Sequence, residues 1–98
     1  MQSNAQALLN SLAAVFPSGL VEYRYEDMLH KFRLECNGRP HWLYVAREFA
    51  ADHTERELIA SLSQWKIPAA FLGSGTSRWL FLNEAGVREV DDSFGRGS

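Results

Sequence analysis

The sequence of 98 residues contains one cysteine, three prolines and no long apolar run. Cys36 therefore has no partner for a disulfide within the chain, which favours a reducing compartment. No apolar run approaches the roughly 20 residues that span a bilayer. The first four residues lack the basic segment with which a secretory signal peptide begins. From these absences we expect a cytoplasmic protein that does not engage a membrane.

An excess of positive charge is also absent. Ten Lys and Arg residues stand against twelve Asp and Glu residues, which gives a formal net charge of −2. Proteins that bind the phosphate backbone of nucleic acids usually carry a clear basic excess, because the release of counterions supplies much of their affinity. The hydrophobic content of 46% is typical of a globular domain, so global disorder is not expected.

The first half of the chain predicts one helix followed by three strands. Residues 4–16 have helical apolar spacing, Ser3 and Gln6 match a capping box, and 17–19 read Pro-Ser-Gly and end the helix. Residues 20–26 alternate as a half-buried strand. Strands over about 28–36 and 39–47 flank Asn37-Gly38, which is the strongest hairpin signal in the chain. A two-residue turn would pair Cys36 with Arg39 and Arg33 with Trp42.

This pairing gives the predicted hairpin two different faces. Phe32, Leu34, Leu43 and Val45 share an apolar face that we assign to the core. Lys31, Arg33, Trp42 and Tyr44 share the other face, which is basic and aromatic.

The second half predicts a helix over 54–65, because Thr54 and Glu57 form a capping box ahead of an apolar stripe. Pro68 indicates that 67–72 begins at the edge or end of a strand, and 73–76 read as a hairpin turn. Residues 77–82 form a strand with Trp79 and Phe81 on one side, and 87–90 are a possible last strand.

The expected fold is therefore a single α+β domain over residues 1–90. Its element order is α-β-β-β-α-β-β, with two helices packed on a mostly antiparallel sheet of about five strands. Residues 91–98, which are rich in Gly, Ser and charge, are expected to be a flexible C-terminal tail.

The candidates for catalysis are few. Cys36 with His30 or His41 could supply a nucleophile and a base, but no third orienting group is identifiable. A buried apolar role explains the cysteine without chemistry. The loop Gly73-Ser74-Gly75 has no lysine and does not open a helix, so it does not match a phosphate-binding loop. We expect no enzyme activity and no cofactor.

A metal site is likewise not expected. The three histidines (His30, His41 and His53) fall on different elements, and no CxxC, HxH or HExxH pattern is present. The acidic residues Asp52, Glu55 and Glu57 gather at a predicted helix start, where the helix dipole alone explains them.

The basic and aromatic face is the most informative feature. Arg33 could cover Trp42 in a cation–π pair on a solvated face, the surface could bind a protein, or it could stack bases and hold phosphate. We expect a non-catalytic protein-interaction module, such as an adaptor, a chaperone-like protein or an inhibitor, which itself forms a homodimer. Nucleic-acid binding through the four residues of this face is the alternative. The expected partner-binding residues are Lys31, Arg33, Trp42, Tyr44, Trp79 and Phe81.

Two families have a similar order of elements. Residues 4–65 resemble a double-stranded-RNA-binding domain, with Ala7-Leu8-Leu9-Asn10 in the first helix and Phe32-Arg33-Leu34 in a strand. That family begins its second helix with lysines, whereas this chain has Thr54-Glu55-Arg56-Glu57, so we do not infer its function. The whole order also resembles the class I type III secretion chaperones, small acidic cytoplasmic homodimers, although the chain lacks their final helix. This resemblance rests on topology and charge and implies binding of a protein segment.

Overall fold

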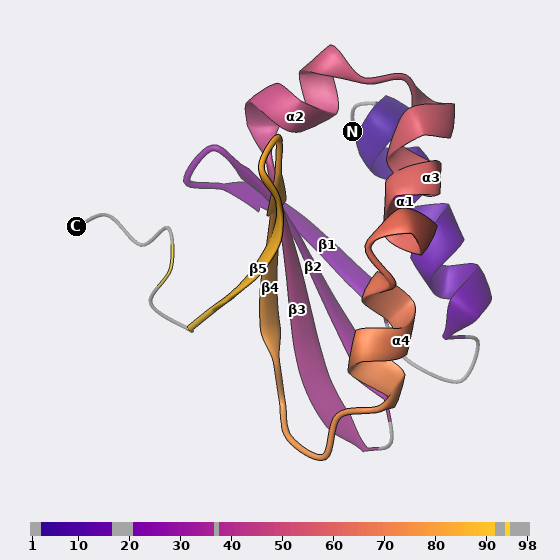
Figure 1. Ribbon diagram of the computed structural model, residues 1–98, viewed down its shortest axis with the longest axis vertical. Helices are drawn as coiled ribbons and strands as arrows, with labels where there is room; N and C mark the ends of the chain where they lie inside the picture. The colour runs from indigo at the N-terminus through magenta and orange to yellow at the C-terminus, as the bar shows by residue number, and fades with distance from the viewer. Residues whose placement is uncertain (1–2, 17–20, 37, 92–93, 95–98) are drawn as a thin grey trace.

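The computed structural model describes residues 3–16, 21–36, 38–91 and 94, and it has an α+β fold with four helices and five strands (Figure 1). The sheet order is β1-β2-β3-β4-β5, and every neighbouring pair is antiparallel except the parallel pair β3–β4. The predicted α+β class is confirmed, with a sheet that is mixed. In chain order the elements are α1 (Ser3–Val15), β1 (Val21–Glu26), β2 (Leu29–Cys36), β3 (Arg39–Ala46), α2 (Arg47–Asp52), α3 (Glu55–Gln64), α4 (Ile67–Leu72), β4 (Trp79–Asn83) and β5 (Gly86–Val90).

The β2–β3 hairpin has the predicted register. Cys36 pairs with Arg39, and Arg33 pairs with Trp42. Gly38 has a φ of 76°, which a glycine adopts without the steric cost of a Cβ atom. Asn37 and the predicted helix stop at 17–19 lie outside the described residues, as does the side chain of Ser3.

The β1–β2 hairpin turns at Asp27 and Met28, which have φ values of 57° and 59°. Two central residues with positive φ are the mark of a type I′ turn. The sequence signal was weak because Met rarely adopts this conformation, unlike Gly or Asn. The Lys31 ammonium donates to the Asp27 carboxylate over 3.1 Å and so ties the turn to β2.

Two predictions of secondary structure are wrong. Residues 67–72 form helix α4 and not a strand, because Pro68 lies in the first turn, where a helix does not need its N–H, and Ile67 and Phe71 are buried one turn apart. Residues 73–76 therefore connect α4 to β4 and are not a hairpin turn. The third strand ends at Ala46, and the unpredicted helix α2 buries Phe49 and Ala50.

The capping box predicted for the helix that begins after Thr54, α3, is confirmed. The backbone N–H of Glu57 donates to the Thr54 hydroxyl over 3.2 Å, and the Glu57 carboxylate accepts from the Thr54 N–H over 2.8 Å. The Thr54 backbone N–H, and after it the Thr54 side chain, hold the pKa of the Glu57 carboxyl below its usual value.

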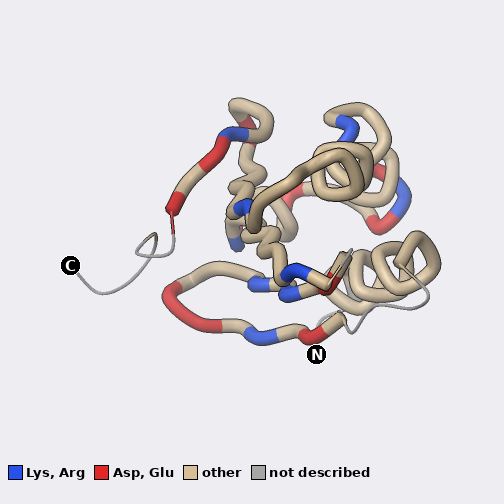
Figure 2. Tube along the Cα trace, turned by 90° about the horizontal axis from the view of Figure 1, so that it is seen from below, with Lys and Arg blue, Asp and Glu red and all other residues tan. Residues whose placement is uncertain are grey.

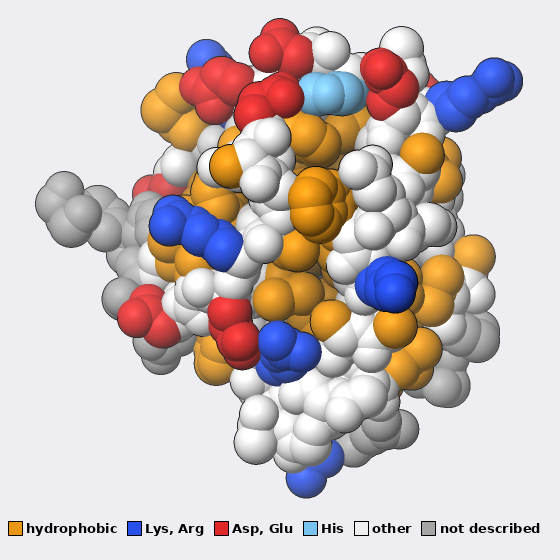
Figure 3. Space-filling view, in the orientation of Figure 1, with side chains coloured by type: hydrophobic (Ala, Val, Ile, Leu, Met, Phe, Trp, Pro, Cys, Tyr) orange, Lys and Arg blue, Asp and Glu red, His pale blue; other side chains and the backbone are white. Residues whose placement is uncertain are grey.

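The described helices α1, α3 and α4 lie on one side of the sheet, which we call the inner face (Figure 1). The main core fills the space between them, and Figure 3 shows hydrophobic side chains between the β4–β5 hairpin and helices α3 and α4. No described helix covers the opposite side, which we call the outer face. Side chains that are fully buried in the core include Leu8, Leu12, Phe32, Leu34, Leu43, Leu58, Ile67, Phe71 and Leu82.

None of the helices in the described part of the chain has the length and apolar character needed to cross a membrane. Within the predicted tail, Asp91 and Phe94 are described. The Phe94 N–H donates to the Asp91 carbonyl over 3.2 Å, and the Phe94 ring packs on the sheet.

Candidate functional site

A stacked pair of indoles lies at the centre of the outer face. Trp42 on β3 and Trp79 on β4 pair in register, their ring centroids are 4.4 Å apart, and their planes differ by 4°. Parallel pairing puts these two residues side by side on the same face, although they are distant in sequence. Both indoles remain partly exposed. The sheet thus presents a stacked, partly exposed aromatic pair on a face that no described helix covers.

The structure brings all six predicted partner-binding residues to this face. Tyr44 pairs with Phe81 two positions beyond the indole pair, and Lys31 and Arg33 flank these aromatic residues from β2. Tyr44 and Phe81 are only 5% and 7% exposed. Two cationic side chains contribute to their cover: the Lys31 ammonium lies 5.2 Å from the Tyr44 ring centre, and the Arg88 guanidinium lies 5.4 Å from that of Phe81.

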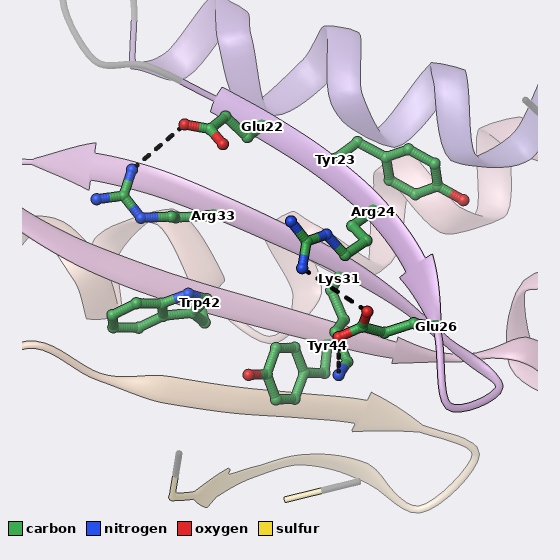
Figure 4. Close-up of a pocket in the computed structure, with 8 residues that line it drawn as sticks. All are labelled: Glu22, Tyr23, Arg24, Glu26, Lys31, Arg33, Trp42 and Tyr44. Carbon is green, nitrogen blue, oxygen red and sulfur yellow. Dashed lines mark hydrogen bonds and ion pairs between the residues drawn. The ribbon is translucent and has the colours of Figure 1, made fainter. Parts of the chain in front are cut away.

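A hollow of about 240 Å³ lies beside Trp42 on this face (Figure 4). Aromatic side chains of β3 form one part of its lining, and charged side chains of β1 and β2 form the rest. In Figure 4 the side chain of Tyr23 points to the other side of the strand, so only the backbone of Tyr23 borders the hollow. The lining residues are Glu22, Tyr23, Arg24, Glu26, Lys31, Arg33, Trp42 and Tyr44.

The basic residues of the hollow are paired with carboxylates. The Arg33 guanidinium lies 3.5 Å from the Glu22 carboxylate and 3.3 Å from that of Glu35. It is therefore engaged with acids, while the cations that lie over aromatic rings are Lys31 and Arg88. Figure 2 shows the same mixture, since blue and red positions are interleaved along β1 and β2.

Lys31 is the more buried of the two predicted cations. Its ammonium lies 3.2 Å from the Glu26 carboxylate and 3.1 Å from that of Asp27. Burial alone would lower its pKa, but the bonds to Asp27 and Glu26 outweigh burial and raise the pKa above its usual value. Lys31 therefore stays charged and has two carboxylate partners, which leaves little net positive potential for a phosphate.

The proposed nucleophile and bases lie on the inner face and are buried. Cys36 is 8% exposed, and His41 is 1% exposed. Nδ1 of His41 accepts a hydrogen bond from the Arg78 backbone N–H over 3.2 Å, and its ring packs against Phe71. His30 bonds through Nδ1 to the Tyr23 hydroxyl over 2.7 Å. These contacts give both histidines a structural role in the fold, and Cys36 is part of the main core.

The three histidines have different neighbours. His53 bonds through Nδ1 to the Phe49 carbonyl over 2.8 Å and lies 3.7 Å from the Glu84 carboxylate. The described residues contain no group of three or more His, Cys, Asp and Glu side chains that could hold a metal ion.

Sequence reasoning missed two residues of the outer face, Phe94 and Arg88. The Phe94 ring lies 4.6 Å from that of Phe81 and 6.2 Å from that of Tyr44, between centres. The Arg88 guanidinium lies 5.5 Å from the Phe94 ring centre. The sequence signal for Phe94 was an aromatic residue in an otherwise polar C-terminal segment. Packing of such a ring on an apolar surface lowers the free energy of the folded chain.

Comparisons with models of protein families, with curated proteins and with solved structures find no match to this chain.

The two buried histidines predict a loss of stability in mild acid. Burial lowers the pKa of His30, whose Nε2 is buried without a hydrogen-bond partner. Burial, and then the charges of Arg39 and Arg78, lower the pKa of His41. The unfolded chain therefore takes up protons at higher pH than the folded one, so stability is full above about pH 6.5 and falls as the pH drops below it.

Urea titrations between pH 7.5 and 5 would measure this loss as a falling midpoint. The double variant His30→Asn/His41→Asn retains a polar atom near each Nδ1 position but cannot be protonated in this range, so its midpoint should change less between these pH values. Glu57 and Glu89, whose pKa values are lowered, would contribute mainly in more acid solution. A midpoint for the unsubstituted protein that is the same at pH 7.5 and 5 would contradict the prediction.

Proposed function

We propose that the protein is a non-catalytic interaction module that binds a protein partner through the outer face. The observation that supports this most strongly is the stacked pair Trp42–Trp79 on a face that no described helix covers. Tryptophan is enriched among the residues that dominate binding energies, because a large rigid ring buries much area at a small entropic cost. Stacking fixes both indoles in advance and lowers that cost further.

The surroundings of the indole pair fit a protein ligand. A typical binding surface has an apolar centre and a polar rim. Here charged residues of both signs border the indoles, with Arg33 between Glu22 and Glu35 on one side. Alternating charge can select a complementary protein partner, whereas a polyanion would meet the carboxylates as well.

A substitution test can separate this surface from the rest of the molecule. We expect Trp42→Ala and Trp79→Ala each to weaken capture of the partner from a lysate of the source cells by at least about tenfold, as for a residue at the centre of an interface. Trp65→Ala is the matched control, since Trp65 is also an exposed tryptophan, 41% accessible, but its ring packs against Gly86 and not on the indole pair. Circular dichroism would establish that all three variants are folded.

The capture would be repeated after nuclease treatment and at several salt concentrations. Loss of all ligands with nuclease, or affinity that falls steeply with salt, would favour nucleic acid instead. Sedimentation of the protein alone would show whether the partner is a second copy of the chain. Equal capture by all three variants and the unsubstituted protein would refute the proposed surface.

A further inference from the structure

One aromatic residue near the C-terminus of the chain already occupies part of the outer face. Phe94 follows β5 closely, and its ring lies against Phe81 and near Tyr44. The Arg88 guanidinium lies within 5.5 Å of the centres of both the Phe94 and the Phe81 rings, so it covers the contact between them. Tyr44 and Phe81 owe part of their burial to this ring.

The contact identifies the kind of side chain that this part of the sheet accepts. The Phe94 ring is tilted by 47° from Phe81 and by 20° from Tyr44, arrangements that aromatic rings favour over a direct sandwich. Trp42 and Trp79 lie next to the occupied position along β3 and β4, and they remain partly exposed. A linear segment that places one aromatic ring at the position of Phe94 could therefore continue over the indoles.

We infer that the outer face is a receptor for an aromatic side chain of a linear peptide segment, and that Phe94 is an internal competitor for that position. This inference rests on the proposed function and names the chemistry of its partner. The residues before Phe94 include Asp91 and Asp92. Because Arg88 lies beside the ring, a peptide with acidic residues ahead of its aromatic residue is the favoured ligand. The partner must displace Phe94 in order to bind.

The chain itself supplies a defined probe. The peptide of residues 91–98, labelled with a fluorophore, would be titrated with the full chain carrying Phe94→Ala and with the unsubstituted chain. A segment tethered through a few residues has an effective concentration of order millimolar. For a peptide that binds with a dissociation constant of about 0.1 mM, the internal ring should then weaken binding to the unsubstituted chain about tenfold.

Three controls make the result specific. The same peptide with alanine in place of its phenylalanine should lose binding to the Phe94→Ala chain. The conservative variant Phe94→Tyr should behave like the unsubstituted chain, because it retains the ring. Arg88→Gln combined with Phe94→Ala should bind the peptide more weakly than Phe94→Ala alone, because it removes the cation that lies beside the ring.

The outcomes separate this inference from the proposed function. Equal binding of both peptides, equal binding to the Phe94→Ala and unsubstituted chains, or no saturable binding to Phe94→Ala would overturn the inference. The effects of Trp42→Ala and Trp79→Ala on partner capture would decide the proposed function independently. If the inference and the proposed function are both correct, the Phe94→Ala chain should also capture more of the natural partner than the unsubstituted chain does.

Discussion

Replacement of Leu43 by alanine should lower the free energy of unfolding by about 2–5 kcal/mol, the range found for buried leucines. Leu43 is fully buried on β3, where it pairs with Phe32 on one side and with Leu80 on the other. Its neighbours belong to the sheet and to the helical layer, so they cannot all move to fill the cavity that the smaller side chain would leave. Urea denaturation followed by circular dichroism would measure the change.

Leu72→Ala provides the matched control for this substitution. Leu72 ends α4 and is 49% exposed, so the same change in side chain should alter stability by about 0.5 kcal/mol or less. A small effect at Leu43, or effects of equal size at both positions, would mean that β3 presents its other face to the helices. The paired variants thus test the register on which the position of the outer face depends.

Replacement of Gly86 by alanine should cost about 2–4 kcal/mol, through backbone strain and a steric overlap together. Gly86 begins β5 with a φ of 110°, a value that residues with a side chain rarely adopt. A Cβ atom there would also lie 2.9 Å from the Trp65 ring, closer than van der Waals contact permits. The Trp65 indole would have to move away from the hairpin.

Two further variants separate these contributions. Gly38→Ala also places alanine at a positive φ, 76°, but a Cβ atom there meets nothing within 4 Å, so it should show the strain alone. In the double variant Trp65→Ala/Gly86→Ala the overlap is removed, and Gly86→Ala should then cost less than in the presence of the indole. Equal costs with and without Trp65 would show that the overlap contributes nothing, and the same free energy of unfolding for Gly86→Ala as for the unsubstituted protein would refute the prediction.

The sequence was sufficient to predict the two faces of the β2–β3 hairpin. Once one pair of facing residues is known, a two-residue turn and strict alternation determine on which face of the sheet every strand residue between Leu29 and Ala46 lies. It was not sufficient to show that Trp79 lies beside Trp42. That contact depends on the parallel pairing of β3 with β4, and no short turn signals such a pairing, because three helices separate the two strands.

The wrong assignment of 67–72 and the failure to predict α2 have a common physical origin. Both helices are only six residues long, and periodicity cannot separate a helical turn from a strand over so few residues. Proline is typical of a strand edge, but the first turn of a helix accommodates it equally well, and Pro68 lies in that turn of α4. Lys66, with a φ of 53°, separates α3 from α4, and a non-glycine residue gives no sequence signal for that conformation.

The parallel pairing of β3 with β4 would also link binding at the outer face to folding of the whole chain. Trp42 and Tyr44 come from one hairpin, and Trp79 and Phe81 come from a strand that reaches them only after α2, α3 and α4 have been placed. A partially folded molecule that retains only the β2–β3 hairpin would present half of the surface. A partner that contacts both indoles therefore binds the native state alone, and at a concentration one hundred times its dissociation constant it would add about 2.7 kcal/mol to global stability.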